Sequence, residues 1–257
     1  MLRPSRLASL AVLAAVAVAS PSVWAQQSPA PAQSTPAVDP AQKEAIEQVV
    51  RDYIRAHPEI VVEALDAYQA KKDAEERSAQ AKTLTSRADE IFRSASSPVI
   101  GNAQGDVTLV EFFDYQCGYC KRSQPDLERL MKADSGLKVV LKEFPILGPA
   151  SVTAARASLA AQKQGKYLDF HTKLMGFKGQ LTDQVVYDTA QQVGLDLDKL
   201  KQDMNDPSVV AELRANMDLA EALGVQGTPA FVINDQIIPG AVGFDALKSQ
   251  IDKDRAG

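Results

Sequence analysis

The feature that most constrains the fold is an apolar stretch that runs directly into a pair of cysteines. Residues 106–115 read DVTLVEFFDY, and this run of β-branched and aromatic side chains predicts a buried strand. The stretch that follows, GYCKRSQPDLERLMKA, has the pattern of a helix, which Pro125 is expected to bend. A strand that leads at once into a helix is typical of an α/β fold. Cys117 and Cys120 would then lie at the junction of the two elements.

The rest of the chain from about residue 96 follows the same α/β pattern. GLKVVLKEFPI, at 136–146, predicts a second strand, whereas residues 150–223 hold several helical patterns and no convincing strand. TPAFVINDQIIPG, at 228–240, predicts a hairpin that turns at Asn234 and Asp235. GFDALKSQIDKD predicts a closing helix. The expected order is therefore strand, helix, strand, helical insertion, hairpin and helix.

The N-terminus indicates export. Arg3 and Arg6 precede an apolar run of Leu, Ala and Val, and VWA at 23–25 has the small or branched residues that a signal peptidase reads. The run is too short for a membrane span, so we expect a signal peptide over 1–25, cleaved after Ala25. An uncleaved anchor is the alternative. We expect the mature protein in a bacterial periplasm, a compartment that permits disulfides.

Two further segments precede the α/β part. Residues 26–40 are rich in Pro, Gln, Ser and Ala and predict a disordered tether. Residues 41–95 predict an N-terminal helical extension that is interrupted at Pro58. Short helices with an apolar stripe are marginal unless the stripe is packed. The partner is either the same segment of other subunits, which would form a homo-oligomer through 41–70, or the α/β domain of the same chain. The charged stretch 71–83 has little to bury, which favours assembly with the same segment of other subunits.

The charge and the number of cysteines argue against a nucleic-acid-binding protein and against a fold held together by disulfides. The chain has 28 basic and 33 acidic side chains, a formal net charge of −5, and no basic stripe, which argues against a nucleic-acid partner. Two cysteines in an exported chain of 257 residues are too few for a disulfide framework. The fold must therefore depend on its hydrophobic core, and the thiols are free for chemistry.

The cysteine pair could serve a zinc site, a structural disulfide or a redox centre. A structural zinc site needs four ligands, and the chain offers only His57, in the extension, and His171, on a helix among aromatic residues. We expect His171 to be a satisfied, half-buried histidine. A disulfide that encloses two residues removes little chain entropy and would stabilise little. The pattern therefore favours a redox dithiol, with no metal and no other cofactor.

The start of a helix is a position that activates a thiol. Unpaired N–H groups and the positive end of the helix dipole would face the sulfur of Cys117 and favour its thiolate. We expect Cys117 to be the nucleophile. Cys120, one turn later and less exposed, would be the resolving thiol. Gly118 and Tyr119 lie between them and would tune the pair, because they decide which N–H groups and how much bulk surround the sulfur.

Three residues outside the dithiol are further candidates. Glu111 lies inside the apolar strand, where a carboxylate is costly unless it has a partner or a task. Buried under the dithiol, it could accept and return the proton of Cys120; the alternative is a solvated position. The Thr228–Pro229 bond opens a strand and could be cis, which would leave the backbone of Thr228 free to pair with a substrate chain. An ordinary trans-proline on an edge strand is equally compatible.

Together these motifs resemble the DsbA superfamily of exported thiol–disulfide oxidoreductases. The resemblance covers roughly 95–255 and rests on EFFDYQCGYCK, KEFPILG, QGKYLDFHTKL and GTPAFVIN with the later IPG. It implies a thioredoxin fold over 96–257, with a helical domain inserted at about 150–223. It also implies that Pro229 is a cis-proline beside the active site, and it matches Glu111 to the family's glutamate on the first strand.

A closer resemblance is to ScsC-like proteins, which pair a Cys-Gly-Tyr-Cys centre with an N-terminal helical extension. Some members oligomerise through that extension and isomerise disulfides. Typical DsbA oxidases carry Pro-His between the cysteines, whereas Gly-Tyr also occurs in dimeric disulfide isomerases. The resemblance therefore favours a disulfide isomerase or reductase that acts on unfolded or misoxidised exported proteins and is kept reduced by a membrane thiol reductase.

Three alternatives stay open at this point. The first is a DsbA-like disulfide oxidase, which would depend on a membrane oxidant instead of a reductase. The second is a metal-binding protein of copper tolerance, although nothing in the sequence looks like a copper site. The third is a structural envelope protein that acts through its helical extension.

Overall fold

The computed structural model describes residues 39–256. The predicted signal peptide (1–25) and nearly all of the predicted tether (26–40) lie outside the described residues. The chain divides into two compact units, one ending at Val62 and the other spanning Glu63–Gly257. Between residues 39 and 256, no helix has both the length and the apolar character needed to cross a membrane.

The first unit is helical, as predicted. Helix α1 (Pro40–Ala56) starts after Asp39, whose carboxylate accepts the N–H of Ala41 at 3.1 Å. It ends before Pro58, where the break was predicted, and α2 (Glu59–Ser86) begins just beyond it. Every residue of α1 is exposed, including five large apolar side chains at helical spacing: Ile46, Val49, Val50, Tyr53 and Ile54.

The second unit begins within α2. From Glu63 to Ala79 none of its residues is buried. Towards the end of the helix, one face becomes partly or fully buried at Gln80, Thr83 and Leu84, and Arg87, directly after the helix, is partly buried as well. The charged stretch 71–83, which was expected to have little to bury, contains no buried residue; Gln80 and Thr83 are partly buried, and Leu84 just beyond it is buried. A short helix, α3 (Ala88–Phe92), follows.

The sheet has five strands in the order β1-β3-β2-β4-β5. The central strands β2 (Val107–Phe113) and β3 (Leu137–Glu143) are parallel, and β4 (Ala230–Ile233) and β5 (Gln236–Pro239) form the predicted hairpin. Its turn has Asn234 in the left-handed region at φ 48°. Strand β1 (Val99–Gly101) pairs antiparallel with β3; it has only three residues and was not predicted.

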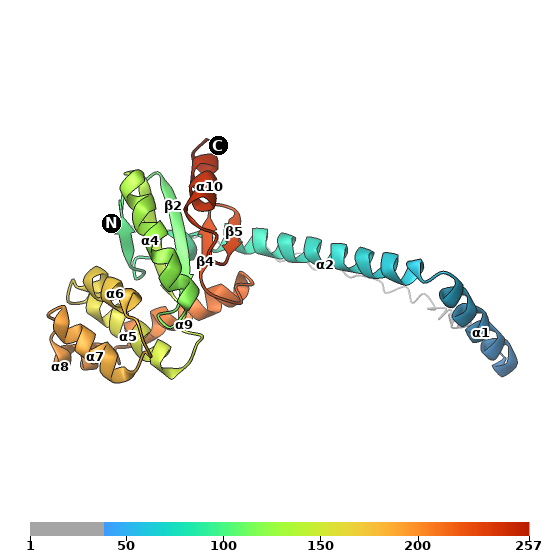
Figure 1. The fold of residues 1–257 in the computed structure, drawn as a ribbon, viewed down its shortest axis with the longest axis horizontal. Coiled ribbons are helices and arrows are strands. Elements are labelled where there is room, and N and C mark those ends of the chain that lie inside the picture. The colour runs from blue at the N-terminus through green and yellow to red at the C-terminus, as the bar shows by residue number, and fades with distance from the viewer. Residues whose placement is uncertain (1–38, 257) are drawn as a thin grey trace, which may run out of the picture. The chain divides into compact units, whose positions relative to one another are not determined.

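The helices follow the predicted order (Figure 1). Helix α4 (Gly118–Ala133) connects β2 to β3. The segment between β3 and β4 contains no strand and has the helices α5 (Pro149–Gln162), α6 (Tyr167–Gly176), α7 (Asp183–Gln192), α8 (Leu197–Asp203) and α9 (Pro207–Ala222). Helix α10 (Phe244–Ala256) closes the chain.

Both faces of the sheet are covered, which explains why β2 is mostly apolar, with only Thr108 and Glu111 as exceptions. Leu109 and Phe113 belong to a core cluster with residues of α4, α10 and the helical insertion. Val110 and Phe112 point to the other face and pack with residues of α9, α3 and the end of α2. Because side chains alternate along a strand, Glu111 points to the same face as Leu109 and Phe113, the face that carries α4.

Candidate functional site

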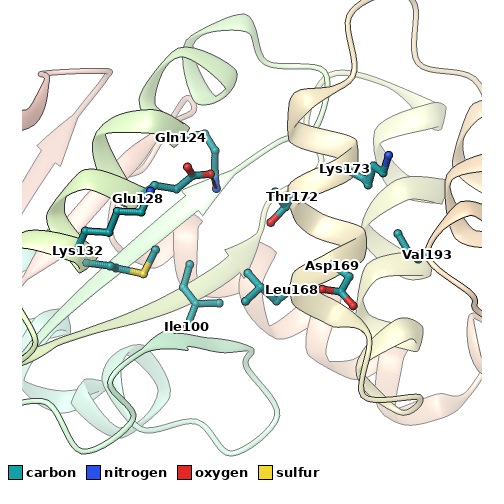
Figure 2. Close-up of a pocket in the computed structure, with 10 residues that line it drawn as sticks. Ile100, Gln124, Glu128, Lys132, Leu168, Asp169, Thr172, Lys173 and Val193 are labelled. Atoms are coloured by element: carbon teal, nitrogen blue, oxygen red, sulfur yellow. Dashed lines mark hydrogen bonds between the residues drawn. The ribbon is translucent and has the colours of Figure 1, made fainter.

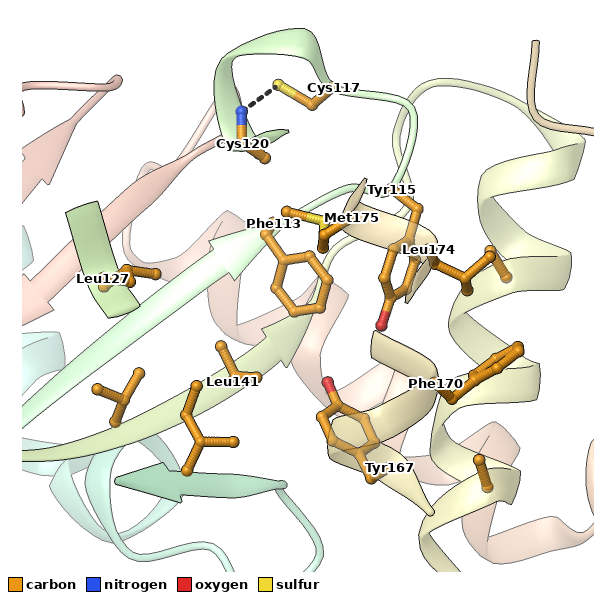
Figure 3. Packing of buried hydrophobic residues seen from close by; sticks show 14 of the residues in the cluster. Phe113, Tyr115, Cys117, Cys120, Leu127, Leu141, Tyr167, Phe170, Leu174 and Met175 are labelled. Atoms are coloured by element: carbon orange, nitrogen blue, oxygen red, sulfur yellow. Dashed lines mark hydrogen bonds between the residues drawn. The ribbon is translucent and has the colours of Figure 1, made fainter. Parts of the chain in front are cut away.

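The two cysteines lie where β2 has ended and α4 begins (Figure 3). Cys117 is the N-cap residue of α4, and its Sγ accepts the backbone N–H of Cys120 at 3.4 Å. Both cysteines are free thiols. The side chain of Cys117 retains 6% of its accessible surface and that of Cys120 none, which confirms that Cys120 is the less exposed of the two. An attacking disulfide or thiol can therefore approach only Cys117.

The fold brings the hairpin next to Cys117. The Thr228–Pro229 peptide bond is cis, as the family resemblance implied, and the trans alternative is wrong. The thiol of Cys117 donates to the carbonyl oxygen of Thr228 at 3.1 Å. The sulfur thus lies between a donor from α4 and an acceptor from the loop before β4, although these residues are far apart in the sequence.

Glu111 is fully buried, so the alternative of a solvated position is wrong. Neither of its carboxyl oxygens has a hydrogen-bond partner among the described residues. Burial raises the pKa of Glu111 to about 8, and the negative charge of Cys117 adds to the effect. Burial also raises the pKa of the Cys120 thiol well above its usual range, and the charge of Glu111 raises it further. The two groups therefore share a site in which a second negative charge is strongly disfavoured.

The residues between the cysteines differ in exposure. Gly118 is the first residue of α4 and is exposed. Tyr119 exposes 61% of its surface, and the guanidinium carbon of Arg122 lies 4.2 Å from its ring centre. Tyr119 therefore presents a large apolar ring beside the thiols, where a substrate chain can contact it.

Asp114 was missed by the sequence analysis. It is buried and accepts three hydrogen bonds: from the N–H of Gln116 at 2.7 Å, from the N–H of Leu147 at 3.0 Å and from Ser151 Oγ at 2.7 Å. It fixes the segment that carries Cys117 to the loop after β3 and to the start of α5. An aspartate side chain often accepts the backbone N–H of the residue two positions later, in a turn. Asp114 and Gln116 follow this pattern, so Asp114 could have been found from the sequence.

A second buried polar group lies behind the thiol segment. The hydroxyls of Tyr115 and Tyr167 donate to Glu143 Oε1 at 3.1 and 2.9 Å, and Tyr115 Oη lies 3.0 Å from His171 Nδ1. His171 is fully buried, not half-buried as expected, and burial lowers its pKa to about 3. It is therefore neutral, and the network joins β3, α6 and the residue two positions before Cys117.

Within residues 39–256, no group of three or more His, Cys, Asp or Glu side chains is placed to hold a metal ion. His57 contacts Glu59 in its own unit, with Nδ1 3.1 Å from Oε1. The described residues therefore offer no support for the metal-binding alternative.

Two cavities of similar size lie in the second unit. One, of about 640 Å³, lies beside the dithiol and is lined by Tyr119, Thr228, Pro229, Ile237 and Pro239, among others. We call it the substrate groove. The other, of about 630 Å³, lies between α4 and α6 (Figure 2) and is lined by Ile100, Gln124, Glu128, Met131, Lys132, Leu168, Asp169, Thr172, Lys173 and Val193. Neither thiol lines this second cavity, and none of the predicted site residues does.

Two family models match the chain. The model described as a DSBA-like thioredoxin domain matches residues 108–252, and that of the copper resistance protein ScsC N-terminal domain matches residues 42–75. The first match covers more than half of the chain, including the dithiol, Glu111 and the cis-proline.

Several solved structures are similar. A thioredoxin-like oxidoreductase from Silicibacter pomeroyi is 45% identical, with 66% of this chain and 98% of that one covered and a TM-score of 0.65. A linker-deletion mutant of Proteus mirabilis ScsC is 33% identical, with 87% and 99% covered and a TM-score of 0.65. A periplasmic thioredoxin-like protein from Salmonella enterica serovar Typhimurium is 35% identical, with 66% and 96% covered and a TM-score of 0.61.

Some curated relatives are much longer than this chain. It is 28% identical over 161 residues to a Na⁺/H⁺ antiporter of Salinispora arenicola and spans only 25% of that protein's length. The match therefore covers one part of that relative.

Proposed function

Because this chain belongs to the family of DsbA-like thioredoxin domains, as a ScsC-like member with a thioredoxin fold, we propose that it exchanges disulfides in exported proteins through Cys117 and Cys120 and works mainly as an isomerase. Thiol–disulfide oxidoreductase chemistry is the activity of the family. The observation that supports it most directly is the position of Cys117 Sγ, between the N–H of Cys120 and the carbonyl of Thr228.

The first step is attack by Cys117. As a thiolate it accepts the N–H of Cys120 and attacks one sulfur of a substrate disulfide, whose other sulfur leaves with the electron pair. A mixed disulfide joins Cys117 to the substrate. Once Cys117 has lost its proton, it no longer donates to Thr228 O, and that carbonyl can accept an N–H of the extended substrate chain instead.

The second step resolves the mixed disulfide in one of two ways. In reduction, Cys120 transfers its proton to Glu111 in the minority of molecules in which a pKa of about 8 leaves this carboxyl group ionised at neutral pH. The Cys120 thiolate then attacks Cys117 Sγ, which releases the substrate thiolate and leaves the Cys117–Cys120 disulfide. In isomerisation, a second thiolate of the substrate attacks the substrate sulfur of the mixed disulfide. A new disulfide forms within the substrate, and Cys117 is released as a thiolate. The raised pKa of the Cys120 thiol slows the first route and gives the substrate time to rearrange.

Two features favour isomerisation over oxidation. The dipeptide between the cysteines is Gly-Tyr, which the isomerases share and the typical oxidases do not. The apolar stripe of α1 is exposed, and a second copy of this chain is the partner that we propose for it, through residues 41–70. An assembly would hold several dithiols near one misoxidised substrate. A DsbA-like oxidase is the remaining alternative.

The proposed compartment is the periplasm. The predicted signal peptide supports it, as does the similarity to a periplasmic thioredoxin-like protein. There a membrane thiol reductase would keep the dithiol reduced for isomerisation, whereas a membrane oxidant would keep it oxidised for disulfide formation. Trapping the thiols in cells with acid and alkylation separates the two cases. A mostly reduced pair supports the isomerase, and a mostly oxidised pair supports the oxidase.

Two variants test the activity in vitro. Cys117→Ala is expected to abolish both the reduction of insulin and the refolding of scrambled ribonuclease. Deletion of residues 41–70 is expected to preserve insulin reduction and impair ribonuclease refolding. An unaffected Cys117→Ala variant would contradict the proposed chemistry. If the truncated protein refolds ribonuclease as well as its parent, the proposed role of assembly is contradicted, but the dithiol chemistry is not.

A further inference from the structure

Helix α2 meets the rest of its unit at Gln80. Residues 63–79 of this helix include none that is buried, and Gln80 is the first residue of the partly buried face that continues through Leu84. Leu84 packs with Leu219 and Leu223 of the cluster formed around α9, and the Arg87 guanidinium donates to the carbonyl oxygen of Asp218 at 3.4 Å. The last two turns of α2 are thus attached to the end of α9.

Gln80 makes a specific contact at this end. Its amide Nε2 donates to the carbonyl oxygen of Leu223 at 3.2 Å. Leu223 is the C-cap residue of α9, and carbonyl groups at the end of a helix have no partner within the helix. The chain then turns through Gly224, at φ +69°, where a Cβ would lie 3.2 Å from Gln80 Nε2. Gln80 therefore lies against the start of the segment that leads to the cis-proline.

The first part of that segment is held in place, because Val225 is buried and its N–H donates to the carbonyl oxygen of Ala220 at 2.8 Å. The residues that follow Val225 have little support. Gln226 and Gly227 are exposed, and no heavy atom lies within 4 Å of the position that a Cβ of Gly227 would occupy. Thr228, whose carbonyl contacts Cys117, comes directly after them. The position of Thr228 thus depends on how the segment is held at its two ends.

Gln80 also lines the substrate groove itself, together with Tyr119 and Pro229. The residues that line the groove are all uncharged and include the apolar Val225 and Ile237 beside the polar Gln80 and Gln226. Such a surface suits an extended, uncharged peptide segment. The side-chain amides of Gln80 and Gln226 are groups that can hydrogen-bond to its backbone.

We propose that Gln80 is a substrate-positioning residue, and that the last turns of α2 form one wall of the groove that holds the substrate chain beside Cys117. This inference rests on the proposed function. Its consequence is that the helix that carries the N-terminal extension is also part of the substrate site.

The test compares Gln80→Glu with Gln69→Glu. Both place a carboxylate on α2, but Gln69 is exposed and bonds only to Asp73 of the same helix. Glutamate keeps the size of glutamine and loses the amide donor to Leu223 O. The reduced full-length proteins are assayed with a peptide disulfide whose cysteines are flanked by uncharged residues, and with oxidised glutathione, which is too small to fill the groove. Circular dichroism in urea compares their folding.

For Gln80→Glu, KM for the peptide is expected to rise about three- to tenfold relative to the parent. This is the change in affinity that corresponds to the loss of one hydrogen bond. The ratio of its peptide rate to its glutathione rate falls accordingly, whereas Gln69→Glu behaves as the parent. An unchanged KM would overturn the inference. So would equal losses with both substrates, or equal losses in both variants. If the parent protein reduces neither disulfide, it is the proposed function that fails.

Discussion

Glu111 is a carboxyl group buried under a dithiol without a hydrogen-bond partner among the described residues, so its charge is costly. With a pKa raised from 4.5 to about 8, it is mostly protonated in the folded protein at neutral pH and ionised in the unfolded chain. The unfolded chain then binds fewer protons, so the free energy of unfolding falls as pH rises from about 4.5 to about 8. Glu111 is therefore a source of instability in the range where the protein works.

We expect Glu111→Gln to remove this pH dependence. At pH 7 the variant should be more stable than the parent by about 3 kcal/mol, because pH 7 lies about 2.5 units above the unfolded pKa and each unit corresponds to about 1.4 kcal/mol. At pH 4 the two proteins should be equally stable, because both side chains are then neutral. Urea unfolding at a series of pH values measures the difference. A constant difference across the series would show that Glu111 does not titrate as described.

The same variant should be slower in exchange. If Glu111 accepts the proton of Cys120, its loss should slow the resolution of the mixed disulfide about 100-fold. Reaction with a peptide disulfide, quenched in acid and examined by mass spectrometry, should show the Cys117 adduct accumulating. The alkylation rate of Cys117 serves as the control for the first step. Resolution at the parental rate would exclude proton transfer through Glu111.

At the residue scale, sequence reasoning found groups that stand out from their local pattern. Glu111 is a carboxylate in an apolar run, and Cys117 and Cys120 are the only cysteines, so each could be recognised without a structure. Gln80 could not be recognised, because a glutamine on a helix has no local signal. Its role depends on where Leu223, far away in the sequence, ends its helix.

Helix α2 shows how one element can have two environments. Leu84 retains 5% of its surface, whereas Leu65, in the same helix, exposes 62%. Leu84→Ala should lower the free energy of unfolding by about 2–4 kcal/mol through lost packing and the cavity left behind. Leu65→Ala should change it by less than about 0.5 kcal/mol. Urea unfolding followed by circular dichroism compares the two, and equal effects would contradict the packing of the last turns of α2.

The elements were largely predictable because their patterns are strong. Strand β2 and the hairpin were recognised from β-branched runs and from the turn at Asn234, and the helical insertion from several helical patterns without a convincing strand. Strand β1 was missed, since three residues carry no periodicity and its existence depends on pairing with β3. The packing of the end of α2 was missed as well. Its buried face is short, and the charged residues before Gln80 conceal it in the sequence.

For the whole molecule, the exposed stripe of α1 leads to a prediction about assembly. Val49 exposes 68% of its surface in the middle of this stripe. If the stripe joins copies of the chain, Val49→Asp should give a monomer, because a buried unpaired carboxylate is costly at an apolar interface. Sedimentation over a range of concentrations measures this, with Glu44→Asp on the same helix as the control. A parent protein that is monomeric at every concentration would rule out assembly through α1.

The position of both thiols at the start of one helix has a consequence for the maturation of the protein itself. Within this chain, only one internal pairing of sulfurs exists, and the two partners are already one helical turn apart. A newly synthesised copy therefore cannot form a wrong internal disulfide. If the chain is the isomerase that we propose, it does not need another isomerase for its own folding.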